Sequence, residues 1–139
     1  MSRIISIHSF RRGTGKTNLI VSIAALMAAG GRRVGLVDTN IQSPAAHLPL
    51  GLDEKSVSCF LNDYLKRAYP IEEATHDVTG RLGVGIDGRL FLAPANPDLA
   101  ALAEIVRGGF DLDLLDQGYR RLIDRLALDV LLVDTHAGI

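Results

Sequence analysis

A glycine-rich loop between a β-branched run and a long apolar segment constrains this chain more than any other feature of its sequence. The run RIISIH leads into the loop, and KTNLIVSIAALMAA, residues 16–29, follows it. The second segment is rich in helix formers and stops at Gly30-Gly31, which is typical of a helix end. Because this helix is apolar on nearly every side, we expect it to be covered on most faces. RRVGLVD then predicts a strand that ends at Asp38.

The middle of the chain continues the alternation of helix and strand. Residues 56–68, SVSCFLNDYLKRA, place their apolar side chains on one helical face and predict a helix. Two short apolar runs flank the turn dipeptide Asp87-Gly88 and suggest a hairpin. The second of these runs, residues 89–93, is the third main strand of the prediction.

Two helices and a final strand complete the pattern. Pro97 and Asp98 begin a helix that Gly108 ends, and an amphipathic helix follows over residues 115–126. LDVLLVD then predicts a buried strand that ends at Asp134. We therefore predict an α/β fold of one domain, residues 1–139, with a mostly parallel sheet and helices on both faces.

Composition supports one compact domain and narrows the classes of partner. The 139 residues are 47% hydrophobic and 22% charged, enough for a sizeable core and too apolar for disorder. A net charge of -1 gives no overall attraction to nucleic acid or anionic membranes. The single cysteine, Cys59, excludes an internal disulfide, and a packing role is favoured over a reactive thiol. Because the N-terminus lacks a signal-peptide pattern, we expect a cytoplasmic location.

The loop contains the residue types that bind phosphate. Gly13 and Gly15 allow a tight bend that points several backbone N–H groups into one concavity, at the positive end of the next helix. The Lys16 ammonium can reach the β and γ phosphates of a nucleotide, and the Thr17 hydroxyl can hold Mg²⁺. A purely structural glycine turn is the alternative. The two later strands, which end at Asp38 and Asp134, argue against a purely structural turn. The carboxyl ends of parallel strands lie at one edge of the sheet, so both aspartates are expected near the loop.

Three motifs occur in a fixed order: RRGTGKTN at residues 11–18, GLVDTNIQSP at 35–44 and VLLVDTHAG at 130–138. In this order they resemble the deviant Walker ATPases of the MinD/ParA class. The resemblance covers nearly the whole chain and implies a P-loop NTPase-like fold that is truncated after the Walker B-like strand. It also implies ATP and Mg²⁺ as cofactors, with ADP as the other nucleotide state.

The resemblance implies roles for individual residues. The phosphates would be bound by Gly13, Thr14, Gly15, Lys16, Thr17 and Asn18, with Gly138 near the γ-phosphate. The metal and its waters would be held by Thr17, Asp38 and Asp134. The residues with a catalytic role would be Lys16, Asn40 and Arg11.

Two departures from the family pattern weaken the case for hydrolysis. Arg11 stands where the family's signature lysine reaches across an ATP-sandwich dimer, and Arg12 replaces the adjacent glycine, so the charge is kept but not the shape. Asn40 stands where the family commonly has an aspartate that orients or activates the attacking water. An amide can hydrogen-bond water but cannot accept a proton as a carboxylate can. Phe10 stands where the strict loop pattern has glycine, which ParA-like loops also tolerate. Nucleotide binding is therefore better supported than hydrolysis.

The sequence leaves three functions open. The first is a MinD/ParA-like switch, in which ATP and Mg²⁺ favour a homodimer that recruits an unidentified protein partner, with hydrolysis slow or lost. The second is a non-catalytic interaction module that keeps the P-loop fold, and Arg11, Arg12 and Asn40 favour it over an efficient enzyme. The third is a metabolic ligase of the same wider fold, for which no substrate pocket is recognisable. The membrane-binding and DNA-binding surfaces of the family would lie largely outside this chain.

Other polar groups have structural explanations. The four histidines lack metal-ligand spacing. Asp111, Asp113 and Asp116 straddle a helix start, where carboxylates favour the positive end of the dipole, so capping is expected.

The family strand order has a consequence for the first strand. It would pair RIISIH with the Asp134 strand on one side, and the strand due on its other side would belong to a segment absent from this sequence, so that Ile4, Ile5 and Ile7 would lie on an open edge. An apolar edge with unpaired N–H and C=O groups is a template for another chain. We therefore expect this chain to self-associate through that edge, in a contact different from the nucleotide-sandwich dimer.

Overall fold

A five-stranded sheet forms the centre of the structure. The computed structural model describes residues 3–7, 16–39, 50–52, 55, 57–108 and 111–135. In chain order the elements are β1 (Arg3–Ile7), α1 (Lys16–Ala29), β2 (Arg33–Asp38), α2 (Leu61–Leu65), β3 (His76–Asp77), the 3₁₀ helix η2 (Thr79–Leu82), β4 (Arg89–Ala93), α3 (Leu99–Gly108), α4 (Leu112–Arg125) and β5 (Val130–Asp134).

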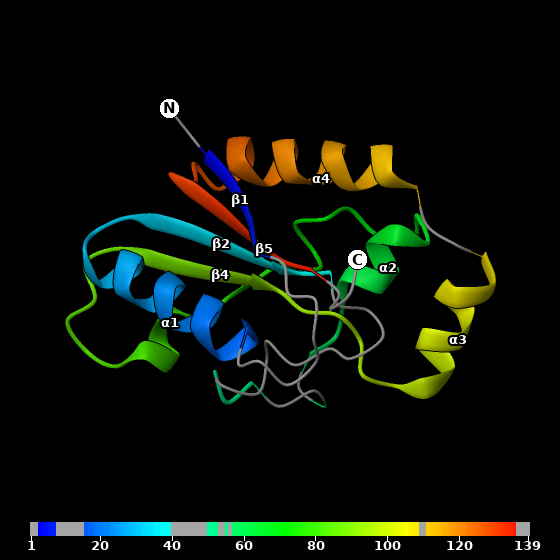
Figure 1. Ribbon diagram of the computed structural model, residues 1–139, viewed down its shortest axis with the longest axis horizontal. Coiled ribbons are helices and arrows are strands. Elements are labelled where there is room, and N and C mark those ends of the chain that lie inside the picture. The colour runs from blue at the N-terminus through cyan, green and yellow to red at the C-terminus, as the bar shows by residue number, and fades with distance from the viewer. Residues whose placement is uncertain are drawn as a thin grey trace.

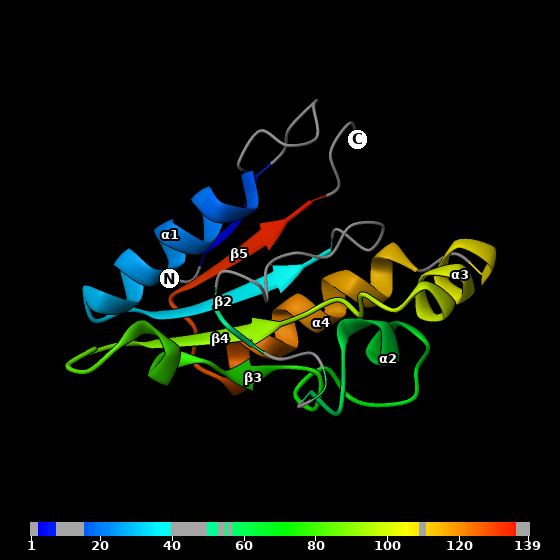
Figure 2. The ribbon, with the colours of Figure 1, turned by 90° about the horizontal axis from the view of Figure 1, so that it is seen from below.

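The strands lie side by side in the order β1-β5-β2-β4-β3 (Figure 2). Of these described strands, β1, β5, β2 and β4 run parallel, and the two-residue β3 runs antiparallel to β4. The predicted mostly parallel sheet is therefore confirmed. So is the predicted pairing of the first strand with the strand that ends at Asp134.

Alternating strand side chains enter two separate cores. Leu36 and Leu132 pack with residues of α1, whereas Val37 and Leu131 pack with residues of α4. The two helices accordingly cover opposite faces of the sheet (Figure 1). Buried on both faces, β2 and β5 read as continuous apolar runs, which is the pattern that parallel strands require. The predicted helices on both faces are confirmed.

The predicted hairpin at Asp87-Gly88 is wrong. Residues 79–82 form η2, and β4 pairs instead with β3, further back along the chain. Gly88 has a different role: its N–H donates to the Ala28 carbonyl at 2.9 Å, at the end of α1. A Cβ at Gly88 would lie 2.1 Å from the Arg32 carbonyl oxygen. Close approach of two backbones therefore explains the glycine.

The helix predicted over residues 56–68 is shorter than expected and is α2 alone. Its start is set by Asp63, whose carboxylate accepts the Phe60 N–H at 2.8 Å. Phe60 itself is extended, with φ -114° and ψ 166°. Beyond the helix, Arg67 has φ 62°, a left-handed conformation that interrupts helical backbone. The apolar residues of α2 are buried as expected, but residues 57–60 of the predicted helix are not helical.

The outer face of α1 is not covered by the described residues. Leu19 is 55% exposed and Leu26 is 73% exposed, and Ser22 between them is also exposed. Because residues three, four and seven positions apart share a helical face, the two leucines lie on one side of α1, turned away from the buried Ile20 and Ala24. One side of α1 is therefore exposed, whereas the residues on its other sides are buried or half-buried. No helix among the described residues is both long and apolar enough to cross a membrane.

Candidate functional site

Two buried carboxylates lie where β2 and β5 end. Asp38 and Asp134 are the last residues of these strands and are register partners. Both are 0% exposed. Side chains two residues apart on a strand share a face, and Leu36 and Leu132 face α1. The two carboxylates are therefore directed to the α1 face of the sheet.

The first turn of α1 contacts one of these two carboxylates. The Thr17 hydroxyl donates to Oδ2 of Asp134 at 2.9 Å, although the two residues are 117 positions apart. The first turn of α1 contains no acidic residue. Its N–H groups and the positive end of its dipole therefore face the carboxyl edge of the sheet without a capping carboxylate in that turn.

Thr39 holds the ends of β2 and β5 together. Its N–H donates to the Asp134 carbonyl at 2.9 Å, and its hydroxyl donates to the same oxygen at 2.8 Å. These bonds position the backbone that carries the Asp134 carboxylate. Thr39 was not predicted from the sequence. The repeat of Val-Asp-Thr at residues 37–39 and 133–135 is the signal that could have found it.

The structure brings together three of the predicted site residues, Thr17, Asp38 and Asp134. Lys16 is the first residue of α1, with its side chain outside the described part of the chain, and Asn18 is exposed on the same turn. The remaining predicted residues lie outside the described ranges: Arg11, Gly13, Thr14, Gly15, Asn40 and Gly138.

The donor atoms at this edge fit Mg²⁺. This cation prefers oxygen ligands, usually one or two carboxylates together with water and phosphate. Thr17 supplies a hydroxyl oxygen, and Asp38 and Asp134 supply buried carboxylates in register. Two buried carboxylates side by side repel each other, so a divalent cation between them would be favourable.

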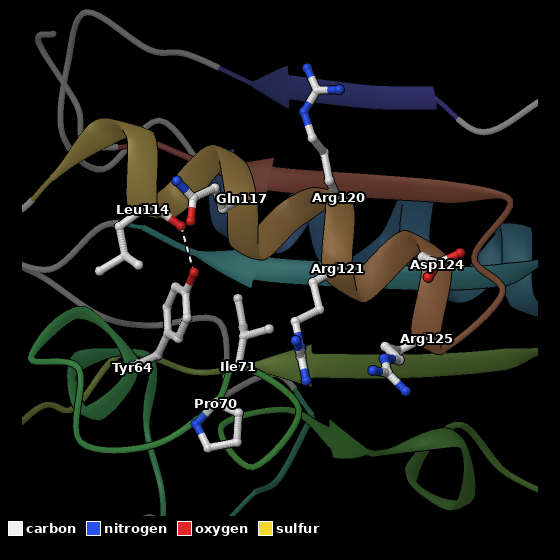
Figure 3. A pocket seen from close by; sticks show the side chains of 9 residues that line it. All are labelled: Tyr64, Pro70, Ile71, Leu114, Gln117, Arg120, Arg121, Asp124 and Arg125. Carbon is white, nitrogen blue, oxygen red and sulfur yellow. Dashed lines mark hydrogen bonds between the residues drawn. The ribbon is translucent and has the colours of Figure 1, made fainter.

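A concave surface lies on the α4 side of the sheet, with a volume of about 680 Å³ (Figure 3). Tyr64, Ile71 and Arg121 are among the residues that line it. The Tyr64 hydroxyl donates to the Leu114 carbonyl at 2.6 Å, and Arg121 is paired with Glu72 at 2.6 Å. The predicted site residues do not line this surface, and the Arg121 charge is already paired. It is therefore separate from the carboxyl-edge site.

Cys59 is a packing residue. It is 4% exposed, and burial raises the pKa of its thiol to about 11. Its carbonyl lies 2.9 Å from Nε2 of His76. A thiol with a raised pKa is a poor nucleophile at neutral pH.

The fold and the site together define an α/β protein of the P-loop NTPase class, with a MinD-like arrangement of strands, helices and acidic strand ends. The family described as the CobQ/CobB/MinD/ParA nucleotide binding domain matches residues 5–133. The chain belongs to this family.

Individual relatives agree with this assignment. The chain is 30% identical over 128 residues to the chromosome partitioning protein ParA of Myxococcus xanthus, spanning 92% of this chain and 40% of that protein. It resembles the septum site-determining protein MinD of Pyrococcus horikoshii, complexed with Mg-ADP, with a TM-score of 0.78, 26% identity, and coverage of 100% of this chain and 51% of that one. It also resembles cobyrinic acid a,c-diamide synthase of Mycobacterium smegmatis, with a bound ATP analogue and magnesium, with a TM-score of 0.73, 27% identity, and coverage of 96% and 51%. The chain therefore spans about half of these solved structures and less of the ParA relative.

Proposed function

We propose that this chain is the ATP-binding part of a MinD/ParA-like molecular switch in the cytoplasm. In this proposal ATP and Mg²⁺ bind at the carboxyl edge of β2 and β5 and favour a homodimer that recruits or positions a protein partner. Hydrolysis is slow or impaired. The hydrogen bond from Thr17 to Asp134 carries the proposal, because it joins the start of α1 to a buried acidic strand end. The nucleotides bound to the MinD and synthase relatives support it.

Phosphate recognition is assigned to the start of α1 and the loop before it. The backbone N–H groups of Gly13, Thr14, Gly15, Lys16, Thr17 and Asn18 donate to phosphate oxygens, with Gly138 near the γ-phosphate. The Lys16 ammonium offsets the phosphate charge. The absence of acidic residues from the first turn of α1 favours an anion there.

Metal coordination is assigned to Thr17, Asp38 and Asp134. Bound Mg²⁺ would supply charge neutralisation between the phosphate oxygens and these two buried carboxylates. The hydroxyl of Thr17 is already placed at 2.9 Å from Asp134, so both oxygens are pre-positioned. Thr39 acts on the site indirectly, because its two hydrogen bonds hold the Asp134 backbone.

Slow hydrolysis follows from two residues of the proposed site. Asn40 can orient a water molecule but cannot remove its proton. Arg11 would extend toward the nucleotide of the second subunit, where its planar guanidinium replaces a point charge. Lys16 stabilises the developing phosphate charge in either case.

A non-catalytic interaction module is the alternative, and the substitutions at Arg11, Arg12 and Asn40 favour it. In that case the chain keeps the fold, and the carboxyl edge no longer binds nucleotide productively. The two functions differ in one measurable property, the affinity for ATP.

Isothermal titration calorimetry with ATP and ADP in the presence of Mg²⁺ tests the proposal. We expect the chain to bind both nucleotides and Lys16→Ala to weaken binding by about tenfold to a hundredfold, because charge-assisted hydrogen bonds are lost. Lys66→Ala is the matched control, since its ammonium pairs with Glu104 at 3.0 Å on the surface. Thr17→Val should abolish the Mg²⁺ dependence of binding, and Thr17→Ser should keep it. Absence of binding to either nucleotide would favour the interaction module.

A further inference from the structure

The concave surface on the α4 side of the sheet is positively charged at one end. Of the nine described residues that line it, three are arginines and one is an aspartate, which leaves a net charge of +2, although the whole chain has a net charge of -1. Arg121 and Arg125 extend from α4 on the same side as Pro70 and Ile71 (Figure 3). Both arginines are exposed. This end of the surface can therefore attract an anionic group.

The two guanidinium groups keep donors for a ligand. Arg121 donates to Glu72 through Nε at 2.6 Å, and no other hydrogen bond joins its guanidinium to the described residues. Arg125 forms no ion pair with a described residue. The hydrogen bond from Arg121 lowers the pKa of Glu72 and the charge of Arg125 lowers it further, so both guanidinium groups lie near one carboxylate. Two guanidinium groups that share one carboxylate have donors left for others.

The spacing of the two arginines matches that of alternate residues in an extended peptide. Arg121 and Arg125 are four residues apart on α4, which corresponds to about 6 Å along the helix axis. Side chains two positions apart on an extended segment share a face and are about 7 Å apart. Two acidic residues at alternate positions can therefore present one carboxylate to each guanidinium.

The other end of the surface is uncharged and lies beside Leu114 and Gln117. Tyr64 and Leu114 form its floor, each 8% exposed, and the 2.6 Å hydrogen bond from the Tyr64 hydroxyl to the Leu114 carbonyl joins them. Pro70 and Gln117 line the same surface and are exposed. An apolar side chain can pack here, next to the positively charged end.

We propose that this surface binds an acidic segment of a partner protein. Two alternate acidic residues of the segment contact Arg125 and then Arg121, and an apolar residue two positions further packs beside Gln117 and Pro70. A peptide fits better than a nucleic acid, because Asp124 among the lining residues and the nearby Glu72 would repel a continuous phosphate backbone. Tyrosine and arginine are also enriched at protein interfaces.

A reversible partner fits this surface better than a permanent element of the same chain. Permanent packing buries apolar side chains, and an arginine without a partner is costly to bury. The apolar floor is already closed by described residues, with Ile71 0% exposed, and the exposed groups around it include Arg121, Asp124 and Arg125. A charged rim around a small apolar centre is typical of a reversible protein interface.

The proposal goes beyond the proposed function and does not rest on it. None of the described residues assigned to ATP or Mg²⁺ lines this surface. Peptide binding should therefore occur without nucleotide, and Arg125→Glu should leave the affinity for ATP unchanged. Calorimetry with ATP tests one proposal and peptide binding tests the other, so the failure of either is recognised separately.

Fluorescence anisotropy with a labelled peptide tests the proposal. The probe is a synthetic peptide with the pattern Glu-Ser-Glu-Ser-Leu, and its control has glutamine in place of both glutamates. We expect saturable binding of the first peptide and no binding of the second. Binding should weaken as salt is added, because the contacts are between exposed charges.

Variants of the chain locate the contact. Arg125→Ala should weaken binding of the acidic peptide by about tenfold, because a charge-assisted pair is lost. Arg107→Glu is the control, since the Arg107 guanidinium bonds the Ala103 carbonyl on α3, away from this surface. Glu72→Gln should tighten binding severalfold, because it releases Arg121 and removes a competing carboxylate.

Charge exchange provides a test that unfolding cannot imitate. Arg125→Glu should lose the acidic peptide. A peptide with lysine in place of only the first glutamate should bind this variant more tightly than it binds the parent, because the opposite charges then meet again.

Four results would overturn the proposal. The first is absence of saturable peptide binding at low salt, and the second is binding that Arg125→Glu does not weaken. The third is a duplex DNA that displaces the peptide and depends equally on Arg125, which would make the surface a nucleic-acid site. The fourth is a surface already occupied, either by a second copy in a dimer that Arg125→Glu dissociates or by further residues of a longer form of the protein that exclude the peptide.

Discussion

α1 and α4 are both 14 residues long and cover opposite faces of the sheet (Figure 1). The two helices differ in their first turns and in the residues on their outer faces. The start of α4 is capped by Asp111, and its outer face carries an ion pair between Arg120 and Asp116 at 3.0 Å. α1 has no acidic residue in its first turn, and it exposes Leu19 and Leu26. A carboxylate therefore completes the start of α4, whereas the described first turn of α1 contains none.

This difference indicates that the first turn of α4 only completes a helix that packs against the sheet, whereas the first turn of α1 also contributes to the proposed nucleotide site. A capped, amphipathic helix needs nothing beyond the sheet beneath it. α1 instead directs its first turn at Asp134 through Thr17. A first turn that lacks a carboxylate leaves its positive end to a phosphate, which is the role that the proposed function gives it.

The largest effect should come from the contact that fixes the far end of α1. Gly88→Ala should lower the free energy of unfolding by about 3 kcal/mol or more, because the new methyl group meets backbone that cannot rotate away. The methyl would lie 2.1 Å from the Arg32 carbonyl and 2.5 Å from that of Ala28. Gly80→Ala is the matched control, since a Cβ there meets nothing within 4 Å. Urea denaturation of both variants gives the comparison, and equal stabilities would contradict the contact.

The next effect concerns the proposed nucleotide site at the other end of α1. Asn40→Asp should raise ATP turnover in a chain that binds ATP, on the order of 10²-fold, because it restores a carboxylate that can accept a proton from water. Phosphate release measures it, with Asn40→Ala as the variant that should bring no gain. An unchanged rate despite measured ATP binding would indicate that Arg12 sets the limit.

On the α4 side, close packing rather than a ligand should decide stability. A Cβ at Gly118 would lie 2.7 Å from Cδ1 of Ile71 and 2.9 Å from the Tyr64 ring. Tyr64 is held by its hydrogen bond to Leu114, drawn in Figure 3, and cannot swing aside freely. Gly118→Ala should therefore cost about 1 kcal/mol net, even though alanine is the better helix former.

A double-mutant cycle sharpens this prediction. Ile71→Val deletes Cδ1, the atom that the new methyl group meets first, and alone should cost about 1 kcal/mol. Combined with Gly118→Ala it should cost less than the sum of the two single changes. Additive costs would show that this pair is not in contact.

The cap of α4 should have an effect of similar size. The Asp111 carboxylate accepts the Asp113 N–H at 2.8 Å and also pairs with Arg67 at 3.3 Å. Asp111→Ala should cost about 1 kcal/mol, whereas Asp111→Asn keeps a capping oxygen and should cost less. Thermal denaturation of the two variants separates the cap from the ion pair. Equal losses would assign the effect to the charge.

The parts of the fold that follow from local sequence patterns were predictable, and the parts that depend on contacts between distant segments were not. Buried parallel strands are continuous apolar runs, so β2, β4 and β5 were found from sequence at their correct positions. The hairpin prediction failed because Gly88 is required for close contact with the backbone of Ala28 and Arg32. A contact between segments so far apart in the chain leaves no local sequence pattern. The apolar pattern of α1 did not show which side of the helix is left exposed, because such a pattern does not show where a neighbouring element lies.

The candidate site divides in the same way. Thr17, Asp38 and Asp134 were predictable because each occupies the end of an element, and topology brings such ends together. Thr39 was not, because its contribution is a pair of hydrogen bonds to one carbonyl on a neighbouring strand. The Val-Asp-Thr repeat is a sequence signal for this residue, and the register between β2 and β5 shows what it bonds to.

The smallest effect in this series is a pH dependence on the outer side of α4. The hydrogen bond from Arg121 lowers the pKa of Glu72 below its ordinary value. A carboxyl group with a lower pKa in the folded chain stabilises it above the ordinary pKa, and this contribution is lost as the pH falls through the folded pKa. The loss should begin below about pH 4 and should be small, because the pair is partly exposed and screened by salt.

Glu72→Gln and Arg121→Ala should each flatten the decline in stability at acidic pH, since either change removes the coupling. Arg107→Ala is the control, because its guanidinium bonds a backbone carbonyl, that of Ala103, rather than a carboxylate. Urea denaturation at several acidic pH values gives the slopes. If Arg121→Ala keeps the parent's slope, the ion pair that joins α4 to the segment before β3 does not persist in solution. The ion pair would then not stabilise the position of α4. The contrast between α4 and α1 would rest on the Asp111 cap and on the packing at Gly118.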